Sequence, residues 1–264
     1  MDSGAKFAKI KEAVRSNFDR SPLQYQSFED RHGFFRELNG ILLAGMHVRD
    51  GADILDIGCG TAASSSHILE TIPHCRVWGL DNSPAMLHVA RARYQESDRL
   101  RFVEADAAKL ADYFDFPFDA IIYSASIFLI PDYRESLRHA KGLLKTKGAL
   151  GISFMDGVYD TAGNHLLTFA DKTAGLGVSL RKPVVLSEFT SYFEEMFPLH
   201  TSWNHDFGFP ETFLREFFSI PAMSAGLFPG LPYDERVRNV NILLDHLPQR
   251  QPLFRWTLMV GEKA

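Results

Sequence analysis

Along the first 155 residues, short apolar runs alternate with stretches whose apolar residues recur at helical spacing. Each run has the length and composition of a buried strand. The predicted strands are 53–57, 76–80, 101–104, 120–123 and 149–155. The stretches 62–71 and 132–144 predict helices between them. A strict strand–helix–strand order requires a parallel sheet with right-handed crossovers, so the pattern predicts an α/β protein.

The beginning of the chain adds helical patterns before the first strand. Apolar residues recur at helical spacing at 5–20 and again at 37–47, with a Ser-Pro break after the first pattern. We expect residues 1–48 to form a helical lid or cap segment and residues 49–264 to form the main domain.

The later part of the chain is less regular. Its predicted elements are a short helix within a polar loop at 156–185, a helix at 187–196 capped by Ser187, and strands at 199–209 and 254–260. Residues 210–252 lie between the two strands as a phenylalanine-rich insertion with a helical pattern at 237–247. An insertion of this length is usually functional or packed on itself. It either caps an apolar acceptor pocket or is a helical addition or subunit contact.

The most informative stretch joins the first strand to the helix after it. Gly58 and Gly60 follow the apolar strand and allow a sharp turn that lets a ligand approach the backbone closely. The helix that starts after Thr61 presents free N–H groups to ligand oxygens. This arrangement predicts a nucleotide-type cofactor at the turn.

Two kinds of cofactor are compatible with the turn itself. Residues 58–63 fit the dinucleotide fingerprint G-x-G-x-x-G/A, and Asp81 lies at about the distance expected for a ribose contact. Asp56, however, stands at the strand end, where its carboxylate would repel a dinucleotide pyrophosphate. A carboxylate there suits a cationic or hydrogen-bond-donating ligand.

Composition and charge narrow the classes of function. The net charge of −5 provides no general attraction to nucleic acid or anionic lipid. No apolar run reaches membrane-spanning length, and the first ten residues lack the apolar core of a signal peptide. Cys59 and Cys75 are the only cysteines, and the first lies within the ligand turn, so we expect a reducing, cytoplasmic location. The histidines form no ligand-spaced cluster, and no metal is expected.

The stretch 54–63 resembles motif I of the class I S-adenosylmethionine-dependent methyltransferases. The segments 77–87, 102–107 and 118–124 resemble the motifs that follow in that family, in the same order and spacing. The resemblance implies a Rossmann-like, doubly wound, seven-stranded and mostly parallel sheet with an antiparallel last strand, together with N-terminal helices and a helical insertion before the last strand. It implies S-adenosylmethionine as cofactor and S-adenosylhomocysteine as product.

The resemblance also implies roles for residues that follow the strands. Asp81 would accept hydrogen bonds from both ribose hydroxyls, and Asp106 would accept one from the adenine amino group. Met86 would pack on the adenine and Ser124 would line the methionine portion, while Tyr25 would touch that portion from the N-terminal segment; ordinary packing is the alternative for Met86 and Tyr25. The complete predicted set of cofactor contacts is Tyr25, Asp56, Gly58, Cys59, Gly60, Asp81, Asn82, Met86, Asp106, Ala107 and Ser124.

Methyl transfer is a displacement at a carbon that the cofactor already activates, so the protein must mainly position the acceptor. A protonated acceptor also needs a base. His205, followed by Asp206 in the predicted sixth strand, is the candidate general base, with His47 and His165 as alternatives and a structural role open for each.

The sequence constrains the methyl acceptor less than it constrains the cofactor. The Asn/Asp-Pro-Pro-Tyr/Phe tetrapeptide of enzymes that methylate amino groups of DNA bases or glutamine is missing after the fourth strand, where the chain has 124–127 as Ser-Ala-Ser-Ile. We therefore expect a small, partly apolar acceptor, no nucleic acid and no membrane insertion, with a homodimer through the insertion as a further expectation. The alternative functions are a non-catalytic methyltransferase-like partner subunit and a nicotinamide-dependent oxidoreductase.

Overall fold

The computed structural model describes residues 3–180, 182–248 and 251–264. Its seven strands form one sheet in the order β3-β2-β1-β4-β5-β7-β6. Strands β1 (Asp53–Ile57), β2 (Arg76–Asp81), β3 (Leu100–Glu104), β4 (Phe118–Ser124) and β5 (Leu144–Tyr159) pair in parallel. Strands β6 (Leu199–Gly208) and β7 (Leu253–Glu262) complete a mixed sheet with an antiparallel last strand. The predicted fold class is confirmed.

The chain forms two compact units, and three of their four boundaries fall within the long strands β5, β6 and β7. The first unit contains the described residues up to Phe154, together with Pro183–Trp203 and Leu258–Ala264. The second contains the described residues of Met155–Lys182 and Asn204–Thr257. The expected division of the chain at residue 48 stays a prediction.

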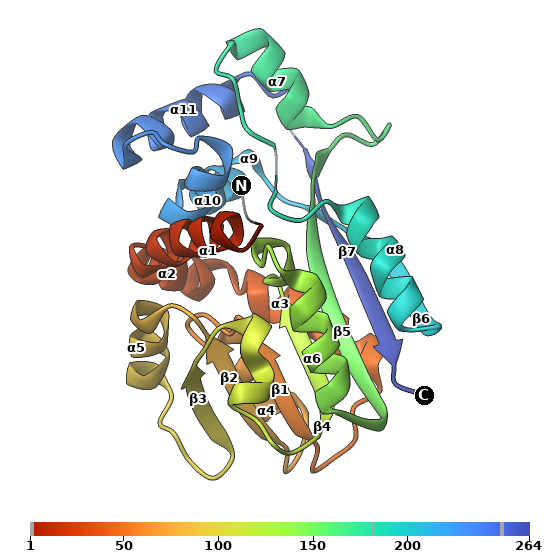
Figure 1. Ribbon diagram of the computed structural model, residues 1–264. Helices are drawn as coiled ribbons and strands as arrows, with labels where there is room; N and C mark the ends of the chain where they lie inside the picture. The colour runs from red at the N-terminus through yellow and green to blue at the C-terminus, as the bar shows by residue number, and fades with distance from the viewer. Residues whose placement is uncertain (1–2, 181, 249–250) are drawn as a thin grey trace. The chain divides into compact units, whose positions relative to one another are not determined.

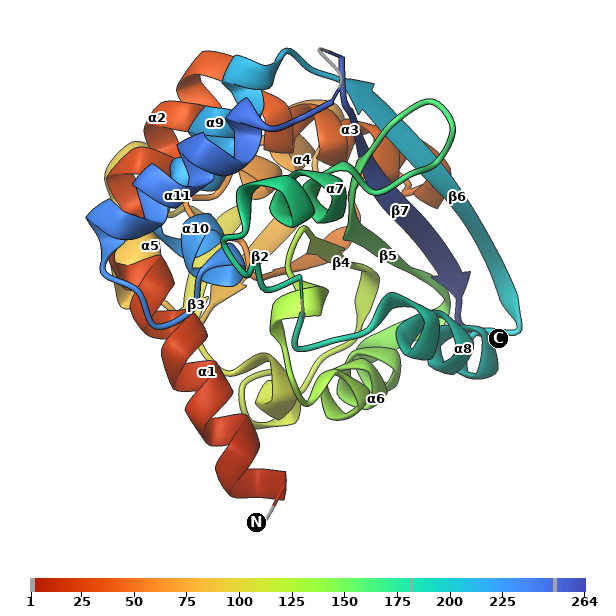
Figure 2. The same ribbon diagram turned by 90° about the horizontal axis from the view of Figure 1, so that it is seen from above.

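In the first unit, helices flank the parallel strands (Figure 1). Helix α1 lies beside α5, α3 beside α4, and α6 beside the 3-10 helix η1. Figure 2 shows α1 running along this unit into α2. The helices and 3-10 helices of this unit are α1 (Ser3–Asp19), α2 (Pro22–His32), α3 (Phe34–Met46), α4 (Ala63–Thr71), α5 (Pro84–Arg93), η1 (Ala107–Asp112), η2 (Ile127–Leu129), α6 (Tyr133–Leu143) and α8 (Leu186–Met196).

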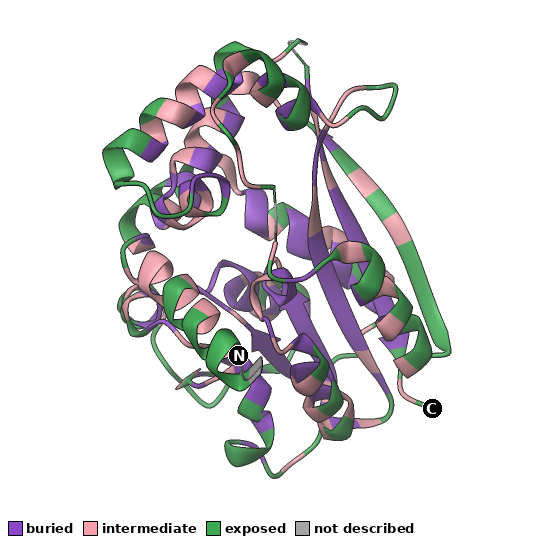
Figure 3. Ribbon diagram, turned by 45° about the horizontal axis from the view of Figure 1, so that its top comes forward, coloured by how far each residue is buried: buried purple, intermediate pink, exposed green. Residues whose placement is uncertain are grey.

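These elements differ in how deeply their side chains are buried. The central strands β1 and β4 are almost entirely buried, as their apolar runs require (Figure 3). Helix α1 differs, because each of its side chains from residue 4 on is exposed or only half-buried. Its apolar residues Phe7, Ile10, Val14 and Phe18 form the half-buried face that their spacing predicted.

The described residues of the second unit form the ends of the long strands and four helices. These are α7 (Leu166–Ala174), α9 (Glu211–Ser219), α10 (Pro221–Leu227) and α11 (Tyr233–Asp245). Phenylalanines of the insertion pack on one another, with the rings of Phe213 and Phe217 stacked and both in contact with Phe254 of β7. The insertion therefore forms an apolar core of its own. Its phenylalanines are the residues that the sequence analysis also considered as the lining of an acceptor pocket.

Several predicted boundaries differ from those of the structure, among them the following three. The helix expected to run to residue 144 ends at Leu143, and β5 begins at once because Leu144 pairs with Phe118 of β4. Ser187 does not cap α8, since Val185 occupies the N-cap position. Helix α11 starts four residues before the expected 237, after a proline.

Candidate functional site

The turn between β1 and α4 is fixed by the strands on either side. The N–H groups of Gly58 and Cys59 both donate to the carbonyl of Leu80 in β2, at 2.7 and 3.0 Å. Gly58 has a φ of +75°, and a Cβ atom there would lie 2.4 Å from Cβ of Ser126, beyond the end of β4. Only glycine fits this position, both because of its left-handed backbone and because of this close neighbour.

Asp56 is a fully buried carboxylate directly before the turn. Its Oδ2 accepts hydrogen bonds from the hydroxyls of Ser64 and Ser65, at 2.5 and 2.6 Å. Burial raises the pKa of Asp56 to about 6, although these hydrogen bonds oppose the shift. Its Oδ1 is buried and has no hydrogen-bond partner among the described residues. An unsatisfied buried acceptor is costly, and a ligand that donates a hydrogen bond would remove this cost.

Asp81 closes the turn from the end of β2. Its Oδ2 accepts from the N–H of Gly60 at 2.8 Å, and its Oδ1 accepts from the N–H of Ser83 at 2.8 Å. Burial raises its pKa to about 6. A carboxylate has about four lone-pair sites, so these two bonds leave capacity for two further donors. Ser83 caps α5 by accepting from the N–H of Met86.

Asp106 occupies a more crowded position than expected. Its Oδ1 accepts from the N–H of Ala108 at the start of η1, and its Oδ2 accepts from Nζ of Lys11 at 2.6 Å. Lys11 also pairs with Asp132, at 2.5 Å. Ala107, its neighbour in the predicted set of cofactor contacts, is buried in η1. No pattern in the sequence connects Lys11 to this carboxylate, which lies 95 residues away in the chain.

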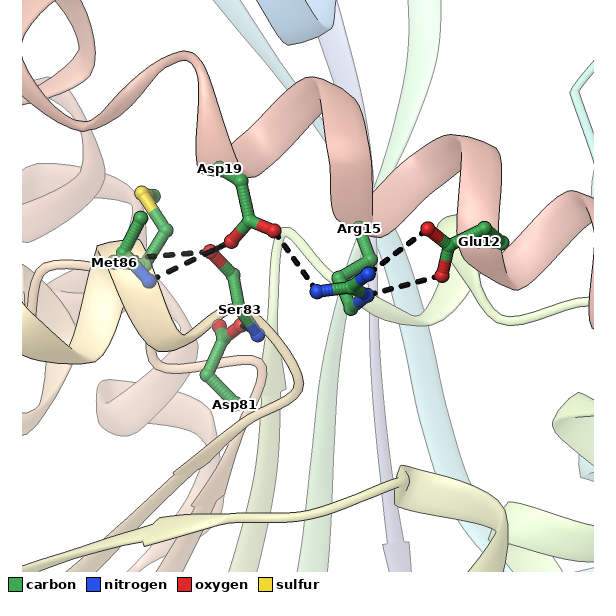
Figure 4. A network of polar contacts seen from close by, with 7 residues as sticks. Glu12, Arg15, Asp19, Asp81, Ser83 and Met86 are labelled. Carbon is green, nitrogen blue, oxygen red and sulfur yellow. Dashed lines mark hydrogen bonds and ion pairs between the residues drawn. The ribbon is translucent and has the colours of Figure 1, made fainter.

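Helix α1 makes a second polar contact at its other end. Asp19 accepts from the hydroxyl of Ser83 at 2.6 Å, and Arg15 donates to the other oxygen of Asp19 at 3.1 Å (Figure 4). Figure 4 shows Asp19 facing the loop that carries Asp81 and Ser83. The N-terminal helix is thus connected to the loops that follow both β2 and β3.

Two hydroxyls near the turn resemble Asp56 Oδ1 in lacking partners. Thr61 is fully buried and Ser124 nearly so, and the Oγ atom of each has no hydrogen-bond partner among the described residues. The structure therefore offers one unsatisfied acceptor and two unsatisfied hydroxyls at the ends of β1 and β4. Sequence reasoning did not include Thr61 among the cofactor contacts, although its place directly after Gly60 could have indicated it.

Side chains from two other elements surround Gly60. A Cβ atom built at Gly60 would lie 3.2 Å from Cε of Met86 and 4.0 Å from Cε1 of Tyr25. The ring of Tyr25 stacks on Phe35, with centroids 4.6 Å apart, and burial raises the pKa of its hydroxyl. Met86 is buried at the start of α5. Both predicted contacts thus lie next to the glycine turn. Cys59 is a buried free cysteine within the turn, and Asn82 is half-buried in the loop after Asp81.

The three candidate bases belong to other elements of the chain. His205 is half-buried in the second unit, with its ring against Phe207, while Asp206 makes a two-point ion pair with Arg255, both bonds being 2.7 Å long. Successive strand residues point to opposite faces of the sheet. Asp206 therefore pairs with Arg255 on the face away from the His205 side chain. His165 caps α7, and His47 ends α3 in a left-handed conformation. The role of His205 as general base stays a prediction.

The described residues contain neither a metal-ligating cluster nor a membrane-spanning helix. No group of three or more His, Cys, Asp or Glu side chains is placed to hold a metal ion. Nor is any described helix both long enough and apolar enough to span a bilayer.

Comparison with known proteins connects this geometry to a family. The family model of a methyltransferase domain matches residues 54–148. Trans-aconitate 2-methyltransferase of Enterobacter sp. (strain 638) is 38% identical over 117 residues, which are 44% of each chain. Trans-aconitate 2-methyltransferase of Rhodopseudomonas palustris (strain BisB5) is 30% identical over 208 residues, covering 71% of this chain and 74% of that protein. The chain thus matches less than half the length of the Enterobacter protein but about three quarters of the other.

Solved structures agree on the fold. Phosphoethanolamine N-methyltransferase 2 of Haemonchus contortus, in complex with phosphomonomethylethanolamine and S-adenosylhomocysteine, has a TM-score of 0.55 and 20% identity. The match covers 85% of this chain and 52% of that one. Because the Rhodopseudomonas relative is matched over most of its length, and the matched domain contains the glycine turn, the chain belongs to the class I S-adenosylmethionine-dependent methyltransferases.

Proposed function

We propose that this protein transfers a methyl group from S-adenosylmethionine to a carboxylate of a small organic acid. The observation that carries the proposal is the 30% identity to a trans-aconitate 2-methyltransferase across 71% of this chain. Trans-aconitate is the first acceptor to test. The earlier expectation of a partly apolar acceptor rested on the phenylalanines of residues 210–252, several of which are buried against one another.

The residues around the turn fit the methionine part of the cofactor. That part carries an ammonium group and a carboxylate, which need an acceptor and donors. Asp56 Oδ1 would accept from the ammonium, and the hydroxyls of Thr61 and Ser124 would donate to the carboxylate; these are the buried atoms without partners. The backbone from Gly58 to Gly60 would allow the ligand to approach closely.

The adenosine part would lie at the loops after β2 and β3. Asp81 would accept from both ribose hydroxyls with its two remaining lone-pair sites, beside Asn82. Asp106 and the N–H of Ala107 would bind the adenine, and Met86 would pack on the ring.

The choice of acceptor decides whether a base is needed. S-adenosylmethionine supplies an electrophilic methyl group on a sulfonium sulfur. A carboxylate is already deprotonated at neutral pH, so the chain needs only to hold one of its oxygens in line with that methyl group and to exclude water. The products are a methyl ester and S-adenosylhomocysteine. A phenol or ammonium acceptor would have to lose a proton, and His205 would then be the base.

The first experiment measures S-adenosylhomocysteine and NAD binding by calorimetry. Asp81→Ala should weaken S-adenosylhomocysteine binding by about 1.5–3 kcal/mol, because it removes a charged hydrogen-bond acceptor. Asp115→Ala, at an exposed aspartate, is the matched control. Binding of NAD in place of S-adenosylhomocysteine would favour an oxidoreductase and overturn the proposal.

The second experiment identifies the acceptor. Radiolabelled S-adenosylmethionine is offered with trans-aconitate, a phenol and a primary amine, and the product is tested for the base-labile bond of a methyl ester. His205→Ala should keep kcat if the acceptor is a carboxylate and lose it for a protonated one. Cofactor binding without transfer to any acceptor would instead indicate the non-catalytic partner subunit.

The formation of a homodimer is also a proposal. Its premise was the apolar content of the insertion, but the rings of Phe213, Phe217 and Phe218 are buried within the second unit. Light scattering of the purified chain decides the oligomeric state.

A further inference from the structure

Helix α1 lies at the surface of the first unit. Residues 4–19 of this helix are exposed or half-buried, so apolar burial holds it only moderately. Its polar contacts at 11 and 19 therefore provide a larger share of its attachment than they would for a core helix.

These contacts lie along one stripe of the helix. Lys11, Arg15 and Asp19 are spaced four residues apart, which places them on neighbouring turns of one face. Lys11 and Asp19 are separated by about 12 Å along the axis, at 1.5 Å per residue. Over this distance α1 extends from the loop after β3, at Asp106, to the loop after β2, at Ser83. These are the loops to which the proposed function assigns the adenine and the ribose.

The contact at Lys11 involves more charged groups than the contact of Asp19 with Ser83 at the other end of the helix. Its ammonium group bridges Asp106 at 2.6 Å and Asp132 at 2.5 Å, and the Lys11 side chain is only 22% exposed. Burial by itself would lower the pKa of Lys11, but the hydrogen bonds to the two carboxylates outweigh it and raise the pKa. Lys11 is therefore charged at neutral pH. The Oδ1 of Asp132 is buried and has no hydrogen-bond partner among the described residues.

We propose that α1 is an ionic clasp over the adenosine end of the cofactor site, and that Lys11 sets how fast the cofactor leaves. The inference rests on the proposed function, because it takes Asp106 and Asp81 as adenosine contacts. Lys11 is a positioning residue: it does not need to touch the cofactor, since it holds α1 to Asp106 on one side and to Asp132 on the other. Asp19 holds the opposite end of the helix through Ser83.

The test is the dissociation rate of S-adenosylhomocysteine, measured by stopped-flow displacement. Lys11→Met keeps the length and apolar stem of the side chain and removes its charge. It should raise the dissociation rate about tenfold, and the matched variant Lys9→Met, at an exposed lysine of the same helix, should leave it within twofold of the wild-type rate. Lys11→Arg keeps the charge and should restore most of the slow release.

Two further measurements exclude a merely structural effect. Raising the ionic strength from about 0.1 to 1 M shortens the Debye length from about 10 to 3 Å, so release from the wild type should accelerate with salt while release from Lys11→Met should not. Asp132→Asn removes one charge of the bridge without touching a proposed cofactor contact, and it should change release in the same direction. Asp132→Asn also serves as the test variant if Lys11→Met does not fold.

The outcomes separate the clasp from the proposed function. Wild type and Lys11→Met with equal release rates would overturn the clasp while leaving the methyltransferase intact. Slower release from Lys11→Met would also overturn it, because Lys11 would then compete with adenine for Asp106. If the wild type does not bind S-adenosylhomocysteine, the proposed function fails and the clasp fails with it. Faster amide exchange of α1 in ligand-free Lys11→Met would then show only that Lys11 anchors the helix.

Discussion

Gly58 and Gly51 form a natural pair for testing why the turn needs glycine. Their φ angles are nearly equal, +75° and +71°, so alanine should be similarly strained at both. They differ in their surroundings, because a Cβ at Gly58 would meet Cβ of Ser126 at 2.4 Å, whereas nothing lies within 4 Å of a Cβ at Gly51. The comparison therefore separates the backbone cost from the steric cost.

The expected magnitudes follow from these two costs. A left-handed alanine costs roughly 1–2 kcal/mol, of which about 0.4–1 kcal/mol is offset by the lower entropy of the unfolded chain. Gly51→Ala should therefore destabilise the protein by roughly 0.5–1.5 kcal/mol. Gly58→Ala adds overpacking of about 1–3 kcal/mol, for a total of roughly 1.5–4.5 kcal/mol.

The assay is urea unfolding, with the free energy of unfolding extrapolated to water. Ser126→Gly removes the atom that the new Cβ would meet, and it also removes the hydrogen bond of 2.6 Å from its hydroxyl to the carbonyl of Ile57. A double-mutant cycle of Gly58→Ala with Ser126→Gly corrects for that loss and should show a coupling energy of about 1–3 kcal/mol. Equal losses for the two glycine variants, or zero coupling, would refute the steric argument.

Other predictions concern charge. S-adenosylhomocysteine should bind more tightly as pH rises through about 6, because burial raises the pKa of Asp56 and Asp81 to about 6 and their carboxylates are the forms that accept from the ligand; a flat Kd between about pH 5 and 8 would contradict the assignment. In the ligand-free protein, the raised pKa of Asp56 means that this group favours folding less as pH rises from about 4 to 6, and Asp56→Asn should reduce this slope in thermal unfolding. Asp119 accepts from Arg49, Lys145 and the N–H of Asp53, which outweigh its burial and lower its pKa. Asp119→Asn should therefore cost about 1–3 kcal/mol at pH 7, and this difference should vanish as pH falls below about 4, the reverse of the trend at Asp56. A loss that persists at low pH would show that the charge of Asp119 is not its cause.

Features that depend on neighbours in the sequence could be predicted. The first strand was predicted at 53–57 and runs from Asp53 to Ile57, because an apolar run bounded by turn residues is a local signal. The cap formed by Ser83 needs only the N–H of Met86, three residues later. The order of strands and helices likewise implied the parallel sheet before any contact was known.

Features that depend on residues distant in the chain required the tertiary structure. The early start of β5 comes from pairing with β4, which outweighs the helical pattern. Neither the burial of the Thr61 hydroxyl without a partner in the described part of the chain nor the ion pair of Lys11 with Asp106 leaves a periodic trace in the sequence. The periodicity of apolar residues shows which face of an element is apolar, but it does not show which polar atoms contact one another. The sequence alone determined the family fold and the turn around which a cofactor would bind. Only the folded chain decided which charges surround that turn, because ion pairs and buried unsatisfied atoms arise where segments far apart in sequence meet.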